Sequence, residues 1–504
     1  MSASKKRKLV DEEDQHQSGP STVEHNIGEK QVAIVSPTEG CSSEESRPDI
    51  LTIHCFDEIF EYLSLKDLHS IGRTCKTMQQ VAGQYFKQNY SSTKIGCNQN
   101  GIYTDLRTQN PVQFLISTFH PIKLFGFEPF ISSMYIHPFV SPLTYFKLPC
   151  NDEQITSVNK ININSIVINY HTAKLLQRIL PRVETIQIQN SKIYDLYEFL
   201  LKYCGGLKRL YIKKSNFDHD YYDKFGQQKW LMQHYRQLEH FEYHPPDSLF
   251  LNELNTFLER NEKIHTFATS LECLWKNRHA FINSEAKLNI LEVKCCQEFG
   301  SDEPTLQSLC NLVNQLHEKG FHRRFHLYVQ RVDEEFNTQA VSLNGLEKLC
   351  IKGFHGTLPP LAGLKELAIL DYSKDSNEPS DNRMETIAND LLDLQRLYLN
   401  NANSIDDVMP FIRRSLKLNK LKIFFKRDSY PIQSSFRKQI FPLSKLNRER
   451  EKLFEARKVT IYVSEKSFVD TKWATRNGDI NLRLIEMKRA ESYEWNQYFT
   501  SKIE

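Results

Sequence analysis

Leu346-Glu-Lys-Leu-Cys-Ile351 is one copy of a six-residue pattern that recurs along most of this chain. In each copy, an apolar residue is followed by two variable residues, a second apolar residue, one variable residue and a third apolar residue. The copies recur about every 26 residues, inside the roughly 20–29 residues that are typical of repeats with one strand each. Strong copies begin at Val183, Leu207, Leu238, Leu288, Leu346, Leu364, Leu394 and Leu418, and weaker ones begin at Ile163, Ile264, His322 and Val459.

The segments between the copies have the apolar spacing of helices. Leu196, Phe199, Leu200 and Tyr203 precede the Gly205-Gly206 pair, and a second such run, from Leu306 to Leu316, precedes Gly320. Strand and helix alternating in this way predict an α/β array with parallel strands on one side and helices on the other. A doubly wound sheet is the rival interpretation, but it gives no reason for one pattern to recur so often.

The pattern resembles the Leu-x-x-Leu-x-Leu core of leucine-rich repeats. This resemblance implies a curved, irregular solenoid over residues 160–470, followed by a cap or tail over 471–504. The fourth and sixth pattern residues would face a shared core and the first would close the layer below. The polar position of that family, three residues beyond the sixth, is degenerate here, because it holds Ser191, Ser215, Cys296 and Ala402.

Strand residues that alternate with the core positions should face the concave side of such an array. They mix tyrosines with acidic and basic side chains, a composition that suits the recognition of a protein. The alternative is that they are ordinary solvated strand positions. The candidate target-binding residues are Gln187, Tyr211, Lys213, Glu242, Glu292, Lys294, Lys352, Tyr398 and Lys422.

Residues 49–92 predict a separate unit of three short helices. Phe56, Ile59, Phe60 and Leu63 lie on one face of the first helix, Ser64 to Asp67 form a capping box for the second, and the third follows Thr74. Three helices in about 40 residues fall below the size that usually folds alone. We therefore expect apolar surface on this unit that is left for a partner.

This segment resembles the F-box. The matching positions are Leu51, Phe56, Ile59, Phe60, Tyr62, Leu63, Asp67, Leu68, Cys75 and Lys76, whereas Thr52, His54 and Met78 replace the family's proline, glutamate and tryptophan. The resemblance implies docking on the Skp-type adaptor of a cullin-RING ubiquitin ligase. The residues that it implies for adaptor contact or for packing of the helical unit are Leu51, Phe56, Ile59, Phe60, Leu63, Leu68 and Cys75. The alternative is a helical hairpin that only caps the array.

Two further segments flank the helical unit. Residues 1–48 are polar and predict a disordered tail, in which Lys5, Lys6, Arg7 and Lys8 form either a nuclear import signal or a solvated charge run. Residues 93–159 are rich in aromatic residues and proline, and predict a packed connector to the first repeat.

Composition and motifs exclude several functional classes. The net charge of +3, from 65 basic and 62 acidic residues, gives no overall drive toward nucleic acid or membrane. No apolar stretch reaches the ~18 residues of a membrane span, and eleven scattered cysteines favour a reducing compartment in the nucleus or cytoplasm. We find no phosphate-binding loop, nucleophile motif or metal-ligand spacing, and predict no cofactor.

Together the two resemblances imply a non-catalytic substrate-recognition subunit of an SCF-type ubiquitin ligase, whose partners would be the adaptor, the cullin and an unknown target protein. The ligase would act by proximity, since it holds a target lysine near a charged conjugating enzyme. The alternative function is a leucine-rich-repeat binding scaffold without a ligase role.

Overall fold

The computed structural model describes fifteen ranges of the chain, all within the compact unit Ile50–Glu504. The basic cluster at 5–8 and most of the connector lie outside them. The described residues are 50–93, 95–98, 101–104, 122–123, 126–136, 157–168, 170–193, 195–217, 229–245, 252–295, 305–332, 334–354, 357–372, 383–425 and 440–493.

Three helices begin the described chain, where the sequence predicts them: α1 (Ile50–Glu61), α2 (Leu65–Gly72) and α3 (Lys76–Asn89). The Ser64 side chain accepts a hydrogen bond from the backbone N–H of Asp67 and so caps α2, as its sequence predicts. The thiol of Cys75 accepts from the N–H of Met78 and caps α3 in the same way. Each cap fixes where its helix starts and so fixes the two short turns.

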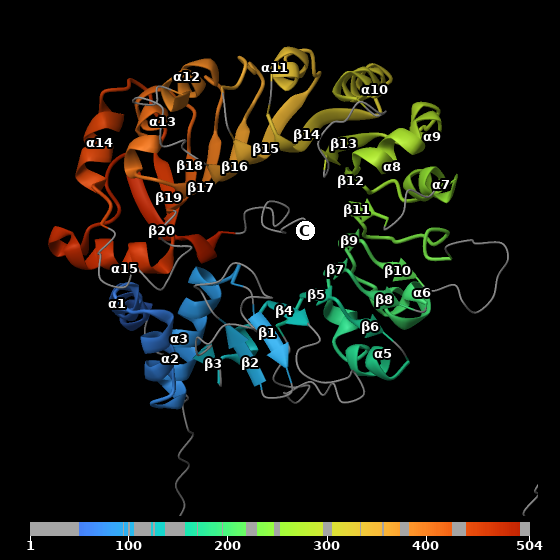
Figure 1. Cartoon of the computed structure of the whole chain (residues 1–504). Coiled ribbons are helices and arrows are strands. Elements are labelled where there is room, and N and C mark those ends of the chain that lie inside the picture. Colours follow the sequence, from blue (N-terminus) through green and yellow to red (C-terminus); the bar gives the residue numbers. More distant parts are fainter. Residues whose placement is uncertain are drawn as a thin grey trace, which may run out of the picture. The chain divides into compact units, whose positions relative to one another are not determined.

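In the described residues, one 17-stranded sheet follows these helices (Figure 1). Strands β3, β2 and β1 pair antiparallel, β1 pairs parallel with β4, and from there each strand is parallel to the next in chain order. The strands after the antiparallel three are β4 (Ser133–Ile136), β5 (Lys160–Asn164), β7 (Thr185–Gln189), β9 (Arg209–Lys213), β11 (His240–His244), β12 (Thr266–Ser270), β13 (Leu288–Lys294), β14 (His322–Arg331), β15 (Leu346–Phe354), β16 (Glu366–Tyr372), β17 (Arg396–Ala402), β18 (Lys420–Phe425), β19 (Val459–Val463) and β20 (Ile485–Arg489).

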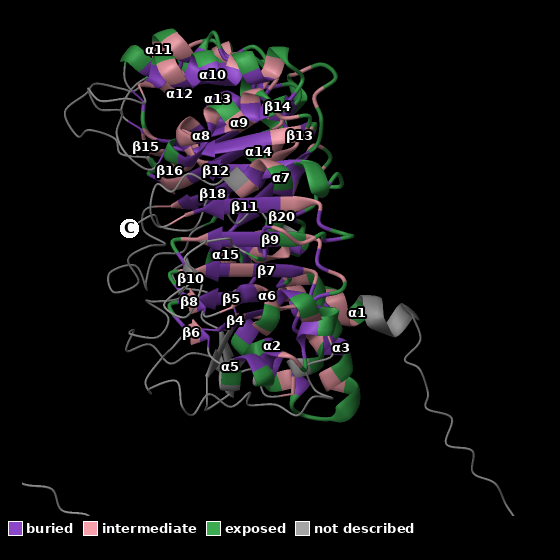
Figure 2. Ribbon diagram, turned by 90° about the vertical axis from the view of Figure 1, so that its right-hand side faces the viewer, coloured by how far each residue is buried: buried purple, intermediate pink, exposed green. Residues whose placement is uncertain are grey.

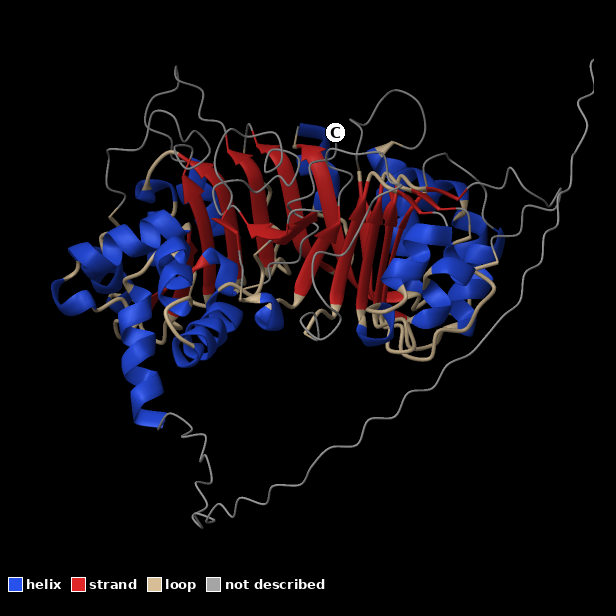
Figure 3. Cartoon of the chain, turned by 90° about the horizontal axis from the view of Figure 1, so that it is seen from below, coloured by secondary structure: helices blue, strands red, loops and turns tan. Residues whose placement is uncertain are grey.

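The antiparallel strands are β1 (Ile95–Asn98), β2 (Gly101–Thr104) and β3 (Ile122–Lys123), and a small separate sheet contains β6 (Val167–Ile168), β8 (Lys192–Ile193) and β10 (Asn216–Phe217). Helices cover the outer side of the large sheet and leave the strands on its inner side (Figures 1 and 3). They are α5 (Tyr170–Leu176), α6 (Leu196–Phe199), α7 (Asn252–Arg260), α8 (Leu271–Lys276), α9 (Arg278–Ile282), α10 (Leu306–Glu318), α11 (Glu334–Ala340), α12 (Arg383–Asp390), α13 (Met409–Arg414), α14 (Leu443–Glu451) and α15 (Glu465–Ala474). The α/β class with a large parallel sheet is therefore confirmed.

The main apolar core of the described residues runs from Phe60 of α1 to Met487 of β20. The fourth and sixth pattern residues, such as Leu349 and Ile351, are buried in it, as the alternation predicts (Figure 2). Ser191 and Ser215 are also buried: the Ser191 hydroxyl accepts from the N–H of Ile166, and the Ser215 hydroxyl accepts from the N–H of Ser191. Serine thus links successive repeats at the degenerate polar position.

Strand β14 shifts the register of the array by two residues. Val293, the sixth pattern residue of its repeat, pairs with Leu327, and Leu327 pairs with Leu349, the fourth pattern residue of the next strand. The strand is ten residues long and has an irregularity between Phe325 and His326, so it can serve both registers. Side chains that lie in one row before and after β14 therefore come from different pattern positions.

Candidate functional site

The inner face of the sheet brings most of the predicted target-binding residues into two parallel rows. Gln187, Tyr211 and Glu242 are register partners in one row, which continues through Ala268 to Glu292. Lys213 and Lys294 belong to the next row, two residues further along each strand. After the register shift that second row holds Tyr328, Cys350, Ala368, Tyr398 and Lys422.

These rows are less exposed than a free recognition surface requires. Tyr211, Glu242, Glu292, Lys294, Tyr398 and Lys422 are buried, and Gln187, Lys213 and Lys352 are half-buried. Adjacent strands lie only ~4.8 Å apart, so long side chains on the inner face cover one another. Both tyrosines of the predicted set therefore pack within the face instead of standing as exposed anchors, and target binding by this face stays a prediction.

Glu242 is the centre of a charge cluster on this face. Its Oε1 atom lies 2.5 Å from Lys294 Nζ, 3.1 Å from Lys213 Nζ and 2.8 Å from His244 Nε2. Burial alone would raise the pKa of Glu242, but the two ammonium groups outweigh it and hold the pKa well below its usual range. Burial lowers the pKa of His244 to about 4, so its neutral ring donates from Nε2 to the carboxylate.

The cluster extends along the first row toward β17. Lys294 Nζ lies 3.6 Å from Glu292 Oε1, and Glu292 Oε2 lies 3.6 Å from His326 Nδ1. Glu366 then lies between Lys348, at 3.7 Å, and Arg396, at 3.4 Å. Glu242 Oε2 is buried without a hydrogen-bond partner among the described residues. The inner face thus presents alternating charges over β9 to β17, an arrangement that suits polar groups of a bound chain.

A second, apolar feature lies on the same face over the later strands. The side chains that form it alternate with the core positions along the strands, so they make a cluster separate from the main core. We call it the inner apolar strip, and it consists of Tyr328, Cys350, Ala368, Tyr398, Phe424, Tyr462 and Ala490, with Leu370 and Tyr493 packed against it.

The F-box-like positions divide between packing and exposure. Phe60 and Leu68 are 1% exposed and belong to the main core, whereas Phe56 and Leu63 are half-buried against it. Ile59, at 52% exposure, and Cys75 are exposed. Leu51 lies in the first turn of α1.

The three helices also contact the far end of the array, which the sequence did not predict. The Arg489 guanidinium donates to Tyr85 Oη at 2.6 Å and to the backbone oxygens of Glu61 and Leu63 at 3.1 and 2.9 Å. Glu465, at the start of α15, accepts from Tyr90 Oη at 2.6 Å and from the N–H of Leu65 at 2.7 Å. The expected partner-dependent apolar surface is thus partly covered by the chain itself, because α15 and β20 pack on this unit.

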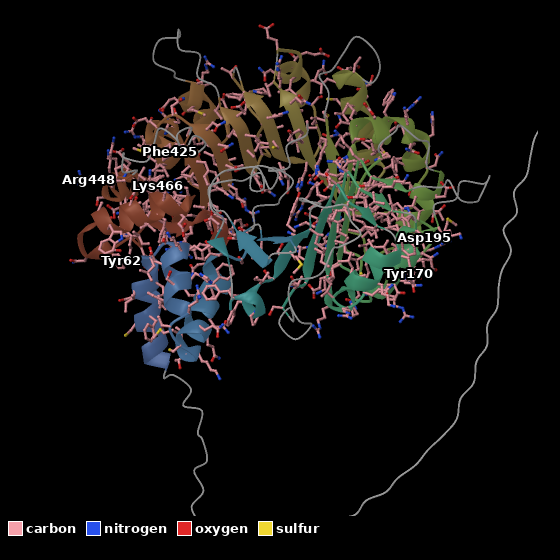
Figure 4. All side chains as sticks on the ribbon, turned by 60° about the horizontal axis from the view of Figure 1, so that its bottom comes forward. Tyr62, Tyr170, Asp195, Phe425, Arg448 and Lys466 are labelled. Atoms are coloured by element: carbon pink, nitrogen blue, oxygen red, sulfur yellow. The ribbon has the colours of Figure 1, made fainter. Side chains whose placement is uncertain are left out.

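The same seam leaves aromatic surface open at Trp473 of α15. The Trp473 indole N–H donates to the backbone oxygen of Tyr62, and the two rings meet edge to face at 5.0 Å. Trp473 is nevertheless 66% exposed. Figure 4 labels Tyr62 at the boundary between the first helices and the last.

None of the histidine, cysteine, aspartate and glutamate side chains of the described residues form a group of three that could hold a metal. None of the helices in the described ranges is long and apolar enough to cross a membrane. No protein-family model matches the sequence, and no curated protein matches it.

Proposed function

We propose that this chain is the target-recognition subunit of an SCF-type ubiquitin ligase. In this proposal the helices α1 to α3 dock on a Skp-type adaptor and the inner face of the repeat array binds a target protein. The chain itself contributes binding, and the associated subunits modify the target lysine. The proposal also takes the array to be a leucine-rich-repeat solenoid of irregular length.

The observation that supports this proposal best is the division of the F-box-like residues. Phe60 and Leu68 stabilise the helical unit from inside, while Ile59 and Cys55 stay exposed one turn apart on α1. An exposed isoleucine one turn from an exposed cysteine offers apolar area for a partner helix, and the Trp473 ring of α15 is exposed as well. The contacts with α15 and β20 hold this unit against the array, so a bound adaptor and a bound target would keep a set geometry.

A pull-down of the tagged full-length chain tests the adaptor interaction. Ile59→Asp should remove the adaptor and the cullin from the recovered complex without lowering the melting temperature, because Ile59 has little core contact to lose. Gln88→Asp, on the exposed side of α3, is the matched control and should retain both partners. Recovery of the adaptor with a folded Ile59→Asp, Cys55→Asp double variant would contradict the proposal.

The contacts at Arg489 favour a second candidate, a binding scaffold whose helices only join the two ends of the array. In that case the wild-type chain would recover target proteins with no adaptor or cullin. A charge reversal on the inner face at a half-buried site, Lys352→Glu, should reduce target recovery in either case and leave the adaptor unaffected. Recovery of the adaptor with the wild-type chain is therefore the result that distinguishes the two functions.

A further inference from the structure

We propose that the inner face of the large sheet binds an acidic segment of the target protein, a stretch of chain rich in aspartate and glutamate. That the bound protein is a target for ubiquitination rests on the proposed function, whereas the preference for acidic segments does not. The proposal follows from how the charged side chains are distributed over the rows of this face and from which of them solvent reaches.

Two rows of the inner face carry only positive charge. We call the row that precedes the first row by two residues on each strand the leading row. It runs from β5 to β14 and its charged residues are Lys160, Arg209 and Arg324. The second row holds four lysines, which are Lys213, Lys294, Lys422 and Lys488. In the described strands neither row contains an aspartate or a glutamate.

The first row, between these two, holds all the described carboxylates of the three rows. They are Glu242, Glu292, Glu366 and Glu486, and the same row also contains Lys348, Arg396 and Lys420. Each of the four carboxylates already lies 3.6 Å or less from a lysine or arginine. The three rows together hold ten lysine and arginine side chains against four glutamates, so the charge in excess is positive.

The excess is clearer among the side chains that solvent reaches. Seven of the ten cations are exposed or half-buried, and Arg209, Arg324, Arg396 and Lys488 are the exposed ones. Of the four carboxylates, Glu242 and Glu292 are buried and the other two are half-buried. A chain that lies on this face therefore meets seven accessible cations and two accessible carboxylates. Opposite charge on the partner steers its approach and favours the bound complex.

The same distribution favours a polypeptide over a nucleic acid. A nucleic-acid strand carries a phosphate at every nucleotide, so it would place phosphates close to the glutamates of the first row. A peptide can instead place neutral or basic side chains opposite those glutamates. The tyrosines of these rows, such as Tyr211 and Tyr398, are buried and offer no open ring on which a base could stack.

A short segment is long enough to follow the accessible cations. From Arg209 on β9 to Arg396 on β17 there are seven strand-to-strand steps, or about 34 Å at ~4.8 Å each. About twelve extended residues span up to about 40 Å. One acidic segment of that length can therefore contact both arginines at once.

Selection from a displayed library of random peptides about twelve residues long, with the full-length chain as bait, tests the preference. The selected peptides should contain at least about twice the aspartate and glutamate of the unselected library, because the accessible charge of the face is positive. Selected peptides that are neutral or basic, or the absence of any selected peptide, would overturn the proposal.

The binding site is tested with one selected acidic peptide, labelled for fluorescence anisotropy. The triple variant Arg209→Gln, Arg324→Gln, Arg396→Gln should weaken its binding at least about tenfold, since three accessible cations are lost. The matched control is Lys445→Gln, Arg448→Gln, Lys466→Gln on the outer helices α14 and α15, which removes the same charge at exposed sites (Figure 4). It should weaken binding less than about twofold.

Equal losses in the two triple variants would place the peptide elsewhere and refute the proposal. Melting temperatures show that both variants are folded, and the double variant Arg209→Gln, Arg324→Gln replaces the triple variant should that one fail to fold. A single-stranded RNA of about twelve nucleotides should compete with the peptide only weakly. Displacement of the peptide by this RNA at the lower concentration of the two would show a nucleic-acid site instead.

These measurements contain no adaptor, so their failure can be told apart from a failure of the proposed function. Ile59→Asp should lose the adaptor and bind the acidic peptide as tightly as the wild-type chain does. The inner triple variant should lose the peptide and still recover the adaptor. A wild-type chain that binds the peptide but recovers no adaptor would be the binding scaffold, with the same preference for acidic segments.

Discussion

Arg489, the last residue of β20, donates a hydrogen bond of 2.6 Å to the hydroxyl of Tyr85 in α3, 404 positions earlier in the chain. The same guanidinium stacks over the Phe468 ring of α15, with its Cζ atom 4.2 Å from the ring centre. Both ends of the array are therefore held by one buried cation. The stability of the helical unit should depend on this side chain.

Arg489→Met should lower the free energy of unfolding by about 3–5 kcal/mol, because it leaves the backbone oxygens of Glu61 and Leu63 without their donor and Glu465 without a nearby cation. Hydrogen exchange should increase first in α1 to α3. Urea titration with exchange mass spectrometry measures both effects. Lys488→Met, at the exposed neighbouring position, is the control, and equal losses in the two variants would argue against a specific role for Arg489.

Gly72→Ala should destabilise the chain by about 1–3 kcal/mol, although alanine favours a helix more than glycine does. A Cβ at position 72 would lie 2.6 Å from Cε1 of Phe127, and that ring is fixed between His69 and Phe86. Gly206→Ala has open space around the added methyl group and serves as the control. Thermal melts should show a lower melting temperature for Gly72→Ala than for Gly206→Ala. An unchanged melting temperature for Gly72→Ala would mean that the Phe127 ring moves aside.

Acid should destabilise the folded chain through its buried histidines. Burial lowers the pKa of His322, like that of His244, from 6.5 to about 4. Between pH 6.5 and pH 4 these histidines bind more protons in the unfolded chain than in the folded chain. The free energy of unfolding therefore falls as the pH falls from 6.5 to 4. His322→Phe should reduce the protons taken up on unfolding at pH 5 by nearly one, measured from the pH dependence of the urea midpoint. The exposed His279→Phe controls for the loss of an imidazole, and an unchanged slope in His322→Phe would contradict the prediction.

The buried carboxyl of Glu491 should give stability the opposite pH dependence to that of the histidines. Burial raises its pKa from 4.5 to about 7, so its folded form favours the proton and its stabilising contribution is lost as the pH rises from 4.5 through 7. Glu491→Gln keeps the backbone oxygen that accepts from Ser92 and should raise stability by about 1–2 kcal/mol at pH 8 but not at pH 4. Glu486→Gln on β20 is the control. A gain that is the same at both pH values would indicate a packing effect instead.

The parts of the fold that depend on local pattern could be predicted from the sequence. The six-residue pattern located the strands of the large sheet from β5 to β19, and the apolar spacing around Phe60 located α1, because side-chain periodicity is fixed within one element. The cluster around Glu242 could not be predicted from the sequence. Its members come from β9, β11 and β13 and meet only through the register of the sheet. The contact of Arg489 with Tyr85 is more remote still, and nothing local marks it.

The contact between the last strand and the first helices limits how this protein can change in length. Open arrays gain or lose units at their ends by duplication or truncation, since each unit needs only its neighbours. Here an added unit after β20 would have to separate Arg489 from Tyr85, and a lost unit would leave the two too far apart to meet. The number of repeats is therefore fixed by closure, and variation should accumulate in the segments between strands instead.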